Sequence, residues 1–133
     1  MTPLIIFGAK YLVFIIALIA AFYIYINKKR RLKIFYVALV ALPLAYALAR
    51  LAGIFYSHHQ PFAEQGFEPL VPHAVDNAFP SDHTLISGVF ASVAYLADRR
   101  VGLILWALAL LVGLSRMQAG LHYGVDVLAA AVL

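Results

Sequence analysis

Long apolar runs are the feature of this sequence that most restricts its fold. The first run extends from Leu4 to Ile26 and is interrupted by one charge, Lys10, near its start. The second extends from Ile34 to Tyr56 and contains Pro43 and one charge, Arg50. A helix needs about 20 mainly apolar residues to cross the hydrocarbon core of a bilayer. Each run is therefore long enough to form a transmembrane helix.

The composition agrees with a membrane protein and excludes several other classes. Apolar residues make up 65% of the chain and charged residues 12%, whereas soluble domains contain about 45–50% and about 25%. An ordinary soluble fold, a disordered chain and a fibrous repeat are therefore excluded. The chain has no cysteine, so a disulfide framework, a thiolate zinc site and a cysteine nucleophile are excluded as well.

Three shorter apolar runs follow a polar segment that ends at residue 83. They extend over residues 84–97, 101–115 and 121–133. With the first two runs, they predict an all-α fold, a polytopic transmembrane bundle of five helices in a single membrane-embedded domain over residues 1–133. The first run is too long for a secretory signal and its positive cluster follows it, so we expect it to be retained. The last run stops without a charged flank, so we expect the natural protein to continue.

The positive residues lie between the apolar runs, where they act as topology anchors. They form two clusters, Lys28, Lys29, Arg30, Arg31 and Lys33, then Arg99 and Arg100. Both clusters face the cytoplasm in the five-helix arrangement, with seven of the ten Lys and Arg residues on that side. A nucleic-acid surface would spread its charge over a polar face, so the net charge of +4 does not indicate a nucleic-acid partner.

This topology gathers the other ionisable side chains at the opposite surface. All five His residues and five of the six acidic residues fall on the outer side of the membrane. The positive-inside rule concerns only Lys and Arg, so it did not impose this segregation. We therefore expect one functional site at the outer, extracytoplasmic face.

The segment Phe79-Pro80-Ser81-Asp82-His83 predicts the start of a helix. Pro80 disfavours helix at the residue before it, and Ser81 or Asp82 can cap the helix that follows. The positive end of that helix would point toward the polar loops and offer free N–H groups to an anion. Considered alone, the segment favours the simpler interpretation of a capped helix that carries an interfacial histidine.

A second polar group lies near the last apolar run and contains Ser115, Arg116, His122 and Asp126. His122 and Asp126 are four residues apart and would share one face of a helix. The carboxylate can there accept the N–H of one imidazole nitrogen and leave the other nitrogen as a nucleophile. Arg116 has a planar fork of donors that suits phosphate oxygens. Ionisable residues at membrane depth indicate function, but a structural Arg116–Asp126 ion pair is an alternative.

These two groups together resemble the motifs of a known enzyme family. Ser-Arg-x5-His-x3-Asp at 115–126, preceded by Pro-Ser-Asp-His at 80–83, is similar to two motifs of the type 2 phosphatidic acid phosphatase superfamily. The tract 62–83, especially Leu70-Val71-Pro72-His73 and residues 76–83, more closely resembles its bacitracin-resistance branch, the undecaprenyl-diphosphate phosphatases. The resemblance covers the chain from about Tyr56 to its C-terminal end.

The resemblance implies a phosphatase that uses neither a metal nor another cofactor. His122 would attack phosphorus, Asp126 would orient His122, and His83 would protonate the leaving group. Arg116, with Ser81, would hold the phosphoryl oxygens. Water would then hydrolyse a phosphohistidine intermediate.

The resemblance also implies the substrate and the location. The substrate would be undecaprenyl diphosphate, a polyprenyl diphosphate lipid, which the enzyme would convert to undecaprenyl phosphate and phosphate. This reaction recycles the cell-wall lipid carrier and confers resistance to bacitracin. We therefore predict a multi-pass protein of the bacterial cell membrane, surrounded by membrane lipids, whose site faces the extracytoplasmic side. The sequence does not predict an oligomeric state.

Two positions depart from the pattern of the superfamily. Asp82 stands where the second motif usually has Gly, although the bacitracin-resistance branch resembles this chain there, and we include Asp82 among the substrate-binding residues. The first motif, Lys-x6-Arg-Pro, aligns on Pro61 and puts Gln60 at the Arg position and Gly53 at the Lys position. Two phosphate-binding cations are therefore missing, and an inactive relative is one alternative.

Gln60 and Arg50 complete the candidate substrate-binding residues. Gln60 occupies the place of a phosphate-binding cation, and the long side chain of Arg50 can snorkel toward the site. The alternative for Arg50 is a structural anchor at the membrane interface.

Two other functions remain open. The same chemistry would serve a phosphatidate or phosphatidylglycerophosphate phosphatase. A different class is a His-rich metal-binding or transport protein that uses His58, His59, His73, His83 and Asp126, although these spacings fit no compact metal site. Apart from that alternative, we expect the first three of these histidines to pack at the interface or against loops.

Overall fold

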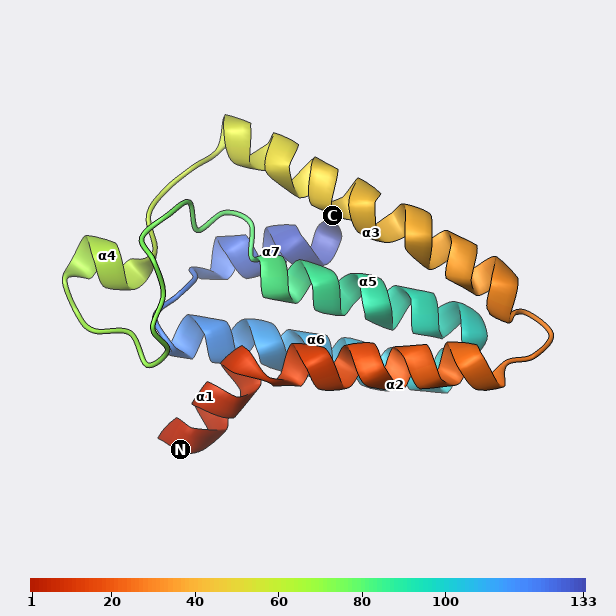
Figure 1. Cartoon of the computed structure of the whole chain (residues 1–133). Coiled ribbons are helices and arrows are strands. Elements are labelled where there is room, and N and C mark those ends of the chain that lie inside the picture. The colour runs from red at the N-terminus through yellow and green to blue at the C-terminus, as the bar shows by residue number, and fades with distance from the viewer.

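The computed structural model describes residues 1–133 and contains helices and their connections, with no β-strand. The helices are α1 (Thr2–Lys10), α2 (Leu12–Ile26), α3 (Arg31–Phe55), α4 (Pro61–Gln65), α5 (Asp82–Ala97), α6 (Arg99–Gln118) and α7 (Gly124–Val132). The all-α class predicted from the sequence is confirmed. Figure 1 shows α2, α3, α5 and α6 running along the length of the bundle, with α4 and the polar loops at one end.

Two or three segments are candidates for membrane spans, where the sequence predicted five. The helices α3 and α6 are long and apolar enough by themselves, and α1 with α2 forms a bent third candidate. The helices α5 and α7 contain 16 and 9 residues, fewer than a span requires. Much of the apolar sequence assigned to these two predicted spans therefore forms shorter helices that pack on the longer ones.

The first apolar run is broken into two helices. The axes of α1 and α2 are bent by 49° at Tyr11, and α1 contacts α6 beyond the bend. There Ala9 is buried in a cluster with four residues from outside the long helices, namely Phe62, Val71, Ala119 and Leu121. The sequence pattern did not predict this bend, because an almost wholly apolar run carries no periodicity that distinguishes one helix from two.

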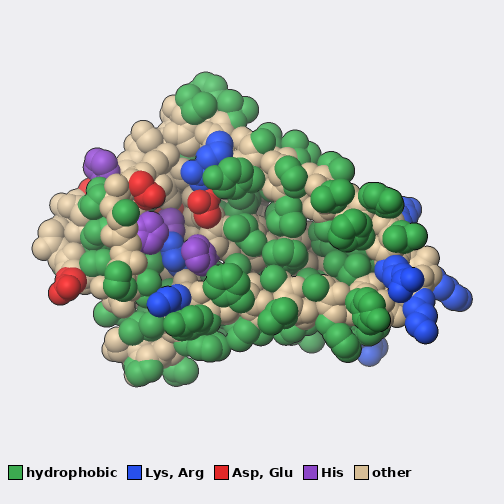
Figure 2. Space-filling model, in the orientation of Figure 1, with side chains coloured by type: hydrophobic (Ala, Val, Ile, Leu, Met, Phe, Trp, Pro, Cys, Tyr) green, Lys and Arg blue, Asp and Glu red, His purple; other side chains and the backbone are tan.

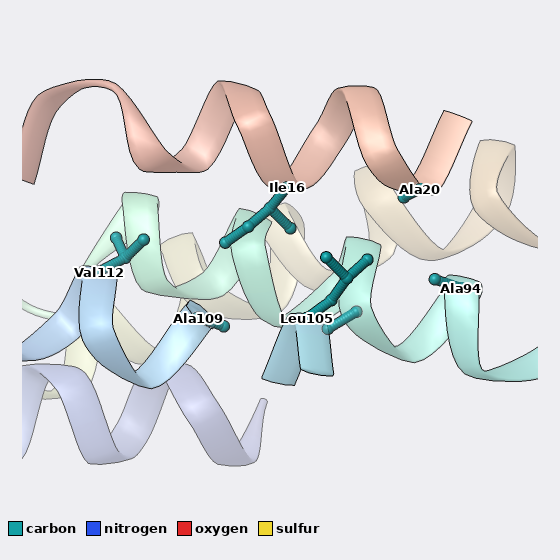
Figure 3. Packing of buried hydrophobic residues seen from close by; sticks show 7 residues of the cluster. Ile16, Ala20, Ala94, Leu105, Ala109 and Val112 are labelled. Carbon is teal, nitrogen blue, oxygen red and sulfur yellow. The ribbon is translucent and has the colours of Figure 1, made fainter. Parts of the chain in front are cut away.

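The helix α5 has contacts with α2, α3, α6 and α7 (Figure 1). A buried apolar cluster joins α2, α5 and α6 and contains Ile16, Ala20, Ala91, Ala94, Leu105, Ala109 and Val112. Figure 3 shows six of these side chains, labelled, between the three helices. Four of the seven are alanines, and small side chains let helix backbones approach closely, as is usual in membranes. This packing fixes α5, whose N-terminal end carries Asp82 and His83.

The charged side chains are segregated along the bundle. Figure 2 shows the largest group of Lys and Arg side chains at one end of the bundle and the His and acidic side chains at the other end, where further Lys or Arg side chains lie among them. Apolar side chains cover much of the surface between the two ends. The basic end contains the connection between α2 and α3 and the start of α6. The segregation inferred from the sequence is therefore a property of the fold, and the apolar flanks between the ends suit a lipid environment.

We predict that Gly102→Ala destabilises the protein, because Gly102 is where α6 approaches the backbone of α5. A Cβ atom added there would lie 2.4 Å from both Cα and Cβ of Tyr95, and a backbone atom cannot move aside as a flexible side chain can. We expect a loss of about 1–3 kcal/mol, as for other overpacked sites, measured as a lower unfolding temperature in detergent. Gly124→Ala is the control, since its Cβ would meet only Met117 Cε at 3.6 Å. Equal unfolding temperatures for the two variants would contradict this account of the α5–α6 contact.

Candidate active site

A polar cavity of about 120 Å³ lies where the N-terminal end of α5 meets the C-terminal ends of α3 and α6. Nine residues line it, and all except Pro80 are polar or charged: Arg50, His73, Asp76, Asn77, Pro80, Asp82, His83, Arg116 and His122. Five of them are candidates from the sequence, separated by up to 72 positions but brought to one place by the fold. The cavity has room for a group about the size of a phosphate.

Arg116 is the permanently charged group at the back of this cavity. It lies in the last turn of α6 and is 4% exposed. Its Nη1 donates to the carbonyl of Ala9 at 3.4 Å, and its Nη2 is 3.4 Å from Nε2 of His73 and 3.2 Å from Nε2 of His122. These distances exceed those of strong hydrogen bonds, and Nε of Arg116 has no partner at all. The guanidinium is thus held in place by long contacts that an anion can replace.

His122 lies just before α7, with Tyr123 as the N-cap residue. Its Nδ1 is 2.9 Å from the carbonyl of Ala78, and since a carbonyl can only accept, Nδ1 carries the proton. The other nitrogen, Nε2, therefore keeps its lone pair and faces the guanidinium of Arg116. A neutral imidazole in this tautomer has the form that a nitrogen nucleophile requires.

The arrangement of His122 and Asp126 differs from the one predicted. The sequence analysis put both residues on one face of a helix, but α7 begins only at Gly124, after a turn in which Gly120 has a φ of +80°. As a result, Oδ2 of Asp126 is 3.6 Å from Nδ1 of His122, too far for a hydrogen bond. The carbonyl of Ala78 takes that position instead.

Asp126 is fully buried and bonds to other groups. Its Oδ1 accepts from Nε2 of His58 at 2.8 Å, and its Oδ2 accepts from the backbone N–H of Tyr123 at 2.8 Å. The alternative of an Arg116–Asp126 ion pair does not occur, because the carboxylate pairs with His58 and Arg116 contacts neither carboxylate oxygen. The contact with His58 was missed, since the two residues are 68 positions apart.

The N-terminal end of α5 contributes Asp82 and His83 to the cavity, but Ser81 lies behind it. Ser81, one of the two residues that the sequence offered as a cap, is the N-cap residue, but its side chain makes no capping bond. It is fully buried, and its Oγ accepts from Oγ1 of Thr84 at 3.1 Å. Its backbone N–H donates to the carbonyl of Asp126 at 3.2 Å. Ser81 thus joins α5 to α7 in this structure.

Arg50 and Gln60 have different environments. The side chain of Arg50 extends from α3 into the cavity, where its Nη2 lies 2.5 Å from Oδ1 of Asp82. Gln60 is buried outside the cavity and bonds through Nε2 to the side chain of Asp76 and the carbonyl of Ala74. Of these two candidates, only Arg50 can reach a ligand in the cavity directly.

Sequence reasoning did not select three further residues of the cavity wall as substrate-binding residues, namely His73, Asp76 and Asn77. It expected His73 to pack at the interface or against a loop, but His73 lines the cavity and contacts Arg116. The resemblance of the tract 70–83 to the bacitracin-resistance branch was the signal that pointed to them. Gln60 holds Asp76 from both sides, because its Oε1 also accepts the backbone N–H of Asp76 at 3.2 Å. The loop that forms this wall is therefore tied to the start of α4.

No group of three or more His, Asp or Glu side chains is close enough to hold a metal ion. The metal-binding alternative from the sequence would need such a group. Within this fold the histidines have separate places. His58 contacts Asp126, His73 contacts Arg116, and His83 lines the cavity.

Comparison with known proteins identifies the family. Residues 37–133 match the sequence profile of the PAP2 superfamily, so this chain belongs to that superfamily, as its motifs predicted. A crystal structure of a transmembrane PAP2-type phosphatidylglycerolphosphate phosphatase from Bacillus subtilis has the same fold, with a TM-score of 0.63, 22% identity, and coverage of 98% of this chain and 67% of that one.

Two curated relatives match almost the whole chain. The bacitracin transport permease protein BcrC of Bacillus licheniformis is 34% identical over 135 residues, covering 100% of this chain and 66% of the relative. The undecaprenyl-diphosphatase BcrC of Bacillus subtilis (strain 168) is 31% identical over 129 residues, covering 96% and 66%. The chain thus spans about two thirds of the length of these relatives.

We predict that inorganic phosphate raises the unfolding temperature of the protein in detergent, because it binds the cavity of the folded state only. Arg116→Gln should weaken phosphate binding by about tenfold or more, since a charge-assisted bond is replaced by a neutral one. Arg50→Gln should weaken it less, because Asp82 already balances the charge of Arg50. Arg100→Gln, from the opposite end of the bundle, is the control. Equal stabilisation of Arg116→Gln and the wild type would contradict a phosphate site at this cavity.

Proposed function

We propose that this protein is a membrane phosphatase that releases the terminal phosphate of undecaprenyl diphosphate. Membership of the PAP2 superfamily and the match to an undecaprenyl-diphosphatase support the proposal. The observation that carries it is the polar cavity, where the side chains of Arg116, His122 and His83 meet. Phosphoryl transfer needs a nucleophile, charge stabilisation for the equatorial oxygens and a route for the leaving group, and these three residues can supply them.

In the first step, Nε2 of His122 attacks the terminal phosphorus. The Ala78 carbonyl keeps the proton on Nδ1, so the lone pair of Nε2 is available once phosphate oxygens take the donors of Arg116. The guanidinium then stabilises the charge that spreads over those oxygens in the transition state. The new N–P bond forms as the bond from phosphorus to the bridging oxygen breaks.

The leaving group is undecaprenyl phosphate, and it needs a proton on the former bridging oxygen. His83 lines the cavity from the first turn of α5, where burial and then the charge of Arg116 lower its pKa to about 4. The negative charge of a bound diphosphate favours the protonated form, and we assign His83, protonated in that complex, the role of the acid. In the second step His83 takes a proton from water, which attacks the phosphohistidine and breaks the N–P bond. Inorganic phosphate is released, and both histidines return to their first state.

Arg50 compensates in part for the two cations that are missing from the first motif. It extends into the cavity from α3, although it precedes the motif in sequence, and Asp82 holds its guanidinium there. A bound diphosphate would compete with the Asp82 carboxylate for the guanidinium of Arg50, since both groups are anions that accept its hydrogen bonds. In this scheme Ser81 acts indirectly through the position of α5, and Gln60 through Asp76.

The segregation of charges supports a location at the outer face of the bacterial cell membrane. The two basic clusters and the cavity lie at opposite ends of the bundle (Figure 2), and clusters of this kind favour the cytoplasm. A site on the outer side would meet lipid carriers whose diphosphate is exposed there. The biological role would then be recycling of the cell-wall lipid carrier, with resistance to bacitracin as a consequence.

The test is release of phosphate by the purified protein from three lipids: undecaprenyl diphosphate, phosphatidate and phosphatidylglycerophosphate. We expect the highest kcat/KM with undecaprenyl diphosphate and no loss of activity in excess chelator. His122→Ala should lower kcat by about a thousandfold or more, as removal of a nucleophile does.

His59→Ala is the matched control, because His59 is exposed and lies outside the cavity. Faster release from phosphatidylglycerophosphate would favour the activity of the structural relative. Activity that disappears in chelator, or that survives in His122→Ala, would contradict the proposed chemistry.

A further inference from the structure

Three histidines near the site, His58, His73 and His122, have different hydrogen-bond partners. These partners determine how many protons each ring carries. His73 and His122 each have a carbonyl at Nδ1 and the guanidinium of Arg116 at Nε2. A carbonyl accepts and a guanidinium donates, so each ring carries one proton and is neutral. Arg116 therefore favours the neutral form of both imidazoles.

His58 has acceptors at both ring nitrogens. Its Nδ1 is 3.0 Å from the carbonyl of His59, and its Nε2 is 2.8 Å from the carboxylate of Asp126. A carbonyl has no proton to donate, and neither has an ionised Asp126, so with Asp126 ionised both bonds exist together only when both nitrogens of His58 are protonated. The geometry therefore describes an imidazolium beside a carboxylate, and a neutral His58 would lose one of the two bonds.

The surroundings of this pair favour the charged form. Asp126 is fully buried, and a buried carboxylate without a countercharge is costly. The side chain of His58 is 16% exposed, and its ring centroid lies 5.3 Å from the centroids of the Tyr56 and Tyr123 rings. No Lys or Arg side chain forms an ion pair with Asp126.

None of the other ionisable groups near the pair supplies a positive charge to Asp126. His122 lies 3.6 Å from Oδ2 of Asp126 but is neutral by its own hydrogen bonds. The phenol of Tyr123 donates to Oε2 of Glu64 at 2.7 Å, and this bond raises the pKa of Tyr123 and keeps it uncharged. Glu64 is engaged by that phenol.

Two connections link His58 to the nucleophile. Through its side chain, His58 holds Asp126, which lies beside Nδ1 of His122. Through its backbone, the carbonyl of His58 accepts the N–H of Ala78 at 2.9 Å, and the carbonyl of Ala78 in turn accepts Nδ1–H of His122. The N–H of His58 also donates to Asn77 at 3.3 Å. Movement of His58 would therefore disturb the carbonyl that accepts Nδ1–H of His122 and the carboxylate that lies beside it.

We propose that His58 is a positioning residue that acts as an imidazolium, pairs with Asp126 and so fixes the orientation of His122. Its effect on turnover rests on the proposed phosphatase function, whereas its charge state does not. His58 lies between Gly53 and Gln60, in the segment where the expected cations are absent. It supplies a positive charge to this segment, directed at Asp126 and away from the substrate.

The direct test is nitrogen NMR of the protein with labelled histidine side chains, in detergent at neutral pH. We expect both ring nitrogens of His58 to be protonated, and those of His73 and His122 to carry one proton per ring. Asp126→Asn should return His58 to the neutral form. The His58 signals are assigned by their loss in His58→Gln, or by elimination, through variants of the other four histidines, if that protein does not fold. A neutral His58 in the wild type would overturn the proposal.

The second test is the kinetics of His58→Gln, which keeps an N–H donor for Asp126 but removes the charge. We expect kcat to fall about tenfold or more, the loss expected for a weakened bond between charged groups, with KM and the unfolding temperature close to wild type. His59→Gln is the matched control and should be unchanged. An unchanged kcat in His58→Gln would overturn the positioning role. A wild-type protein that releases no phosphate would instead refute the proposed function, and the NMR result alone would then decide the charge of His58.

Discussion

The buried guanidinium of Arg116 is the interaction centre on which the site depends. A permanent charge that is 4% exposed at the end of an apolar bundle requires polar partners, and the fold supplies them from α1, from the loop before α5 and from the segment before α7. The bend between α1 and α2 supplies one of these partners, since it brings the carbonyl of Ala9 to Arg116. The bonds are long enough to be exchanged for bonds to phosphate oxygens, so the same charge that organises the site can bind the ligand.

A second charged group, the pair of Asp126 and His58, lies near Arg116 without contacting it. Asp126 is compensated by His58 and not by Arg116, which leaves the guanidinium free and His122 neutral. This separation explains how a carboxylate and a guanidinium can lie on either side of one imidazole without neutralising each other. It also gives separate tasks to the two sides of His122: Ala78 and Asp126 adjoin Nδ1, and Arg116 and the substrate adjoin Nε2.

The sequence predicted the helical class, the family and five of the residues that line the cavity, because these depend on apolar runs and on short motifs. It did not predict the bend at Tyr11, since a continuous apolar run has the same pattern with or without a bend. It placed His122 on a helix that begins two residues later, because a turn at Gly120 was not distinguished from helix. The contact between His58 and Asp126 joins residues 68 positions apart, and nothing in a single sequence indicates which of five histidines meets a given carboxylate.

The proposed phosphatase mechanism requires a covalent bond between His122 and phosphorus. The most direct test is to measure the mass of the protein during turnover. The protein is mixed with undecaprenyl diphosphate, denatured rapidly in alkali, which preserves phosphohistidine, and digested for mass spectrometry. We expect one phosphate on the peptide that contains His122, and none when His122 is replaced by Ala. Phosphate found only on another residue, or turnover with no phosphorylated protein at any reaction time, would contradict it.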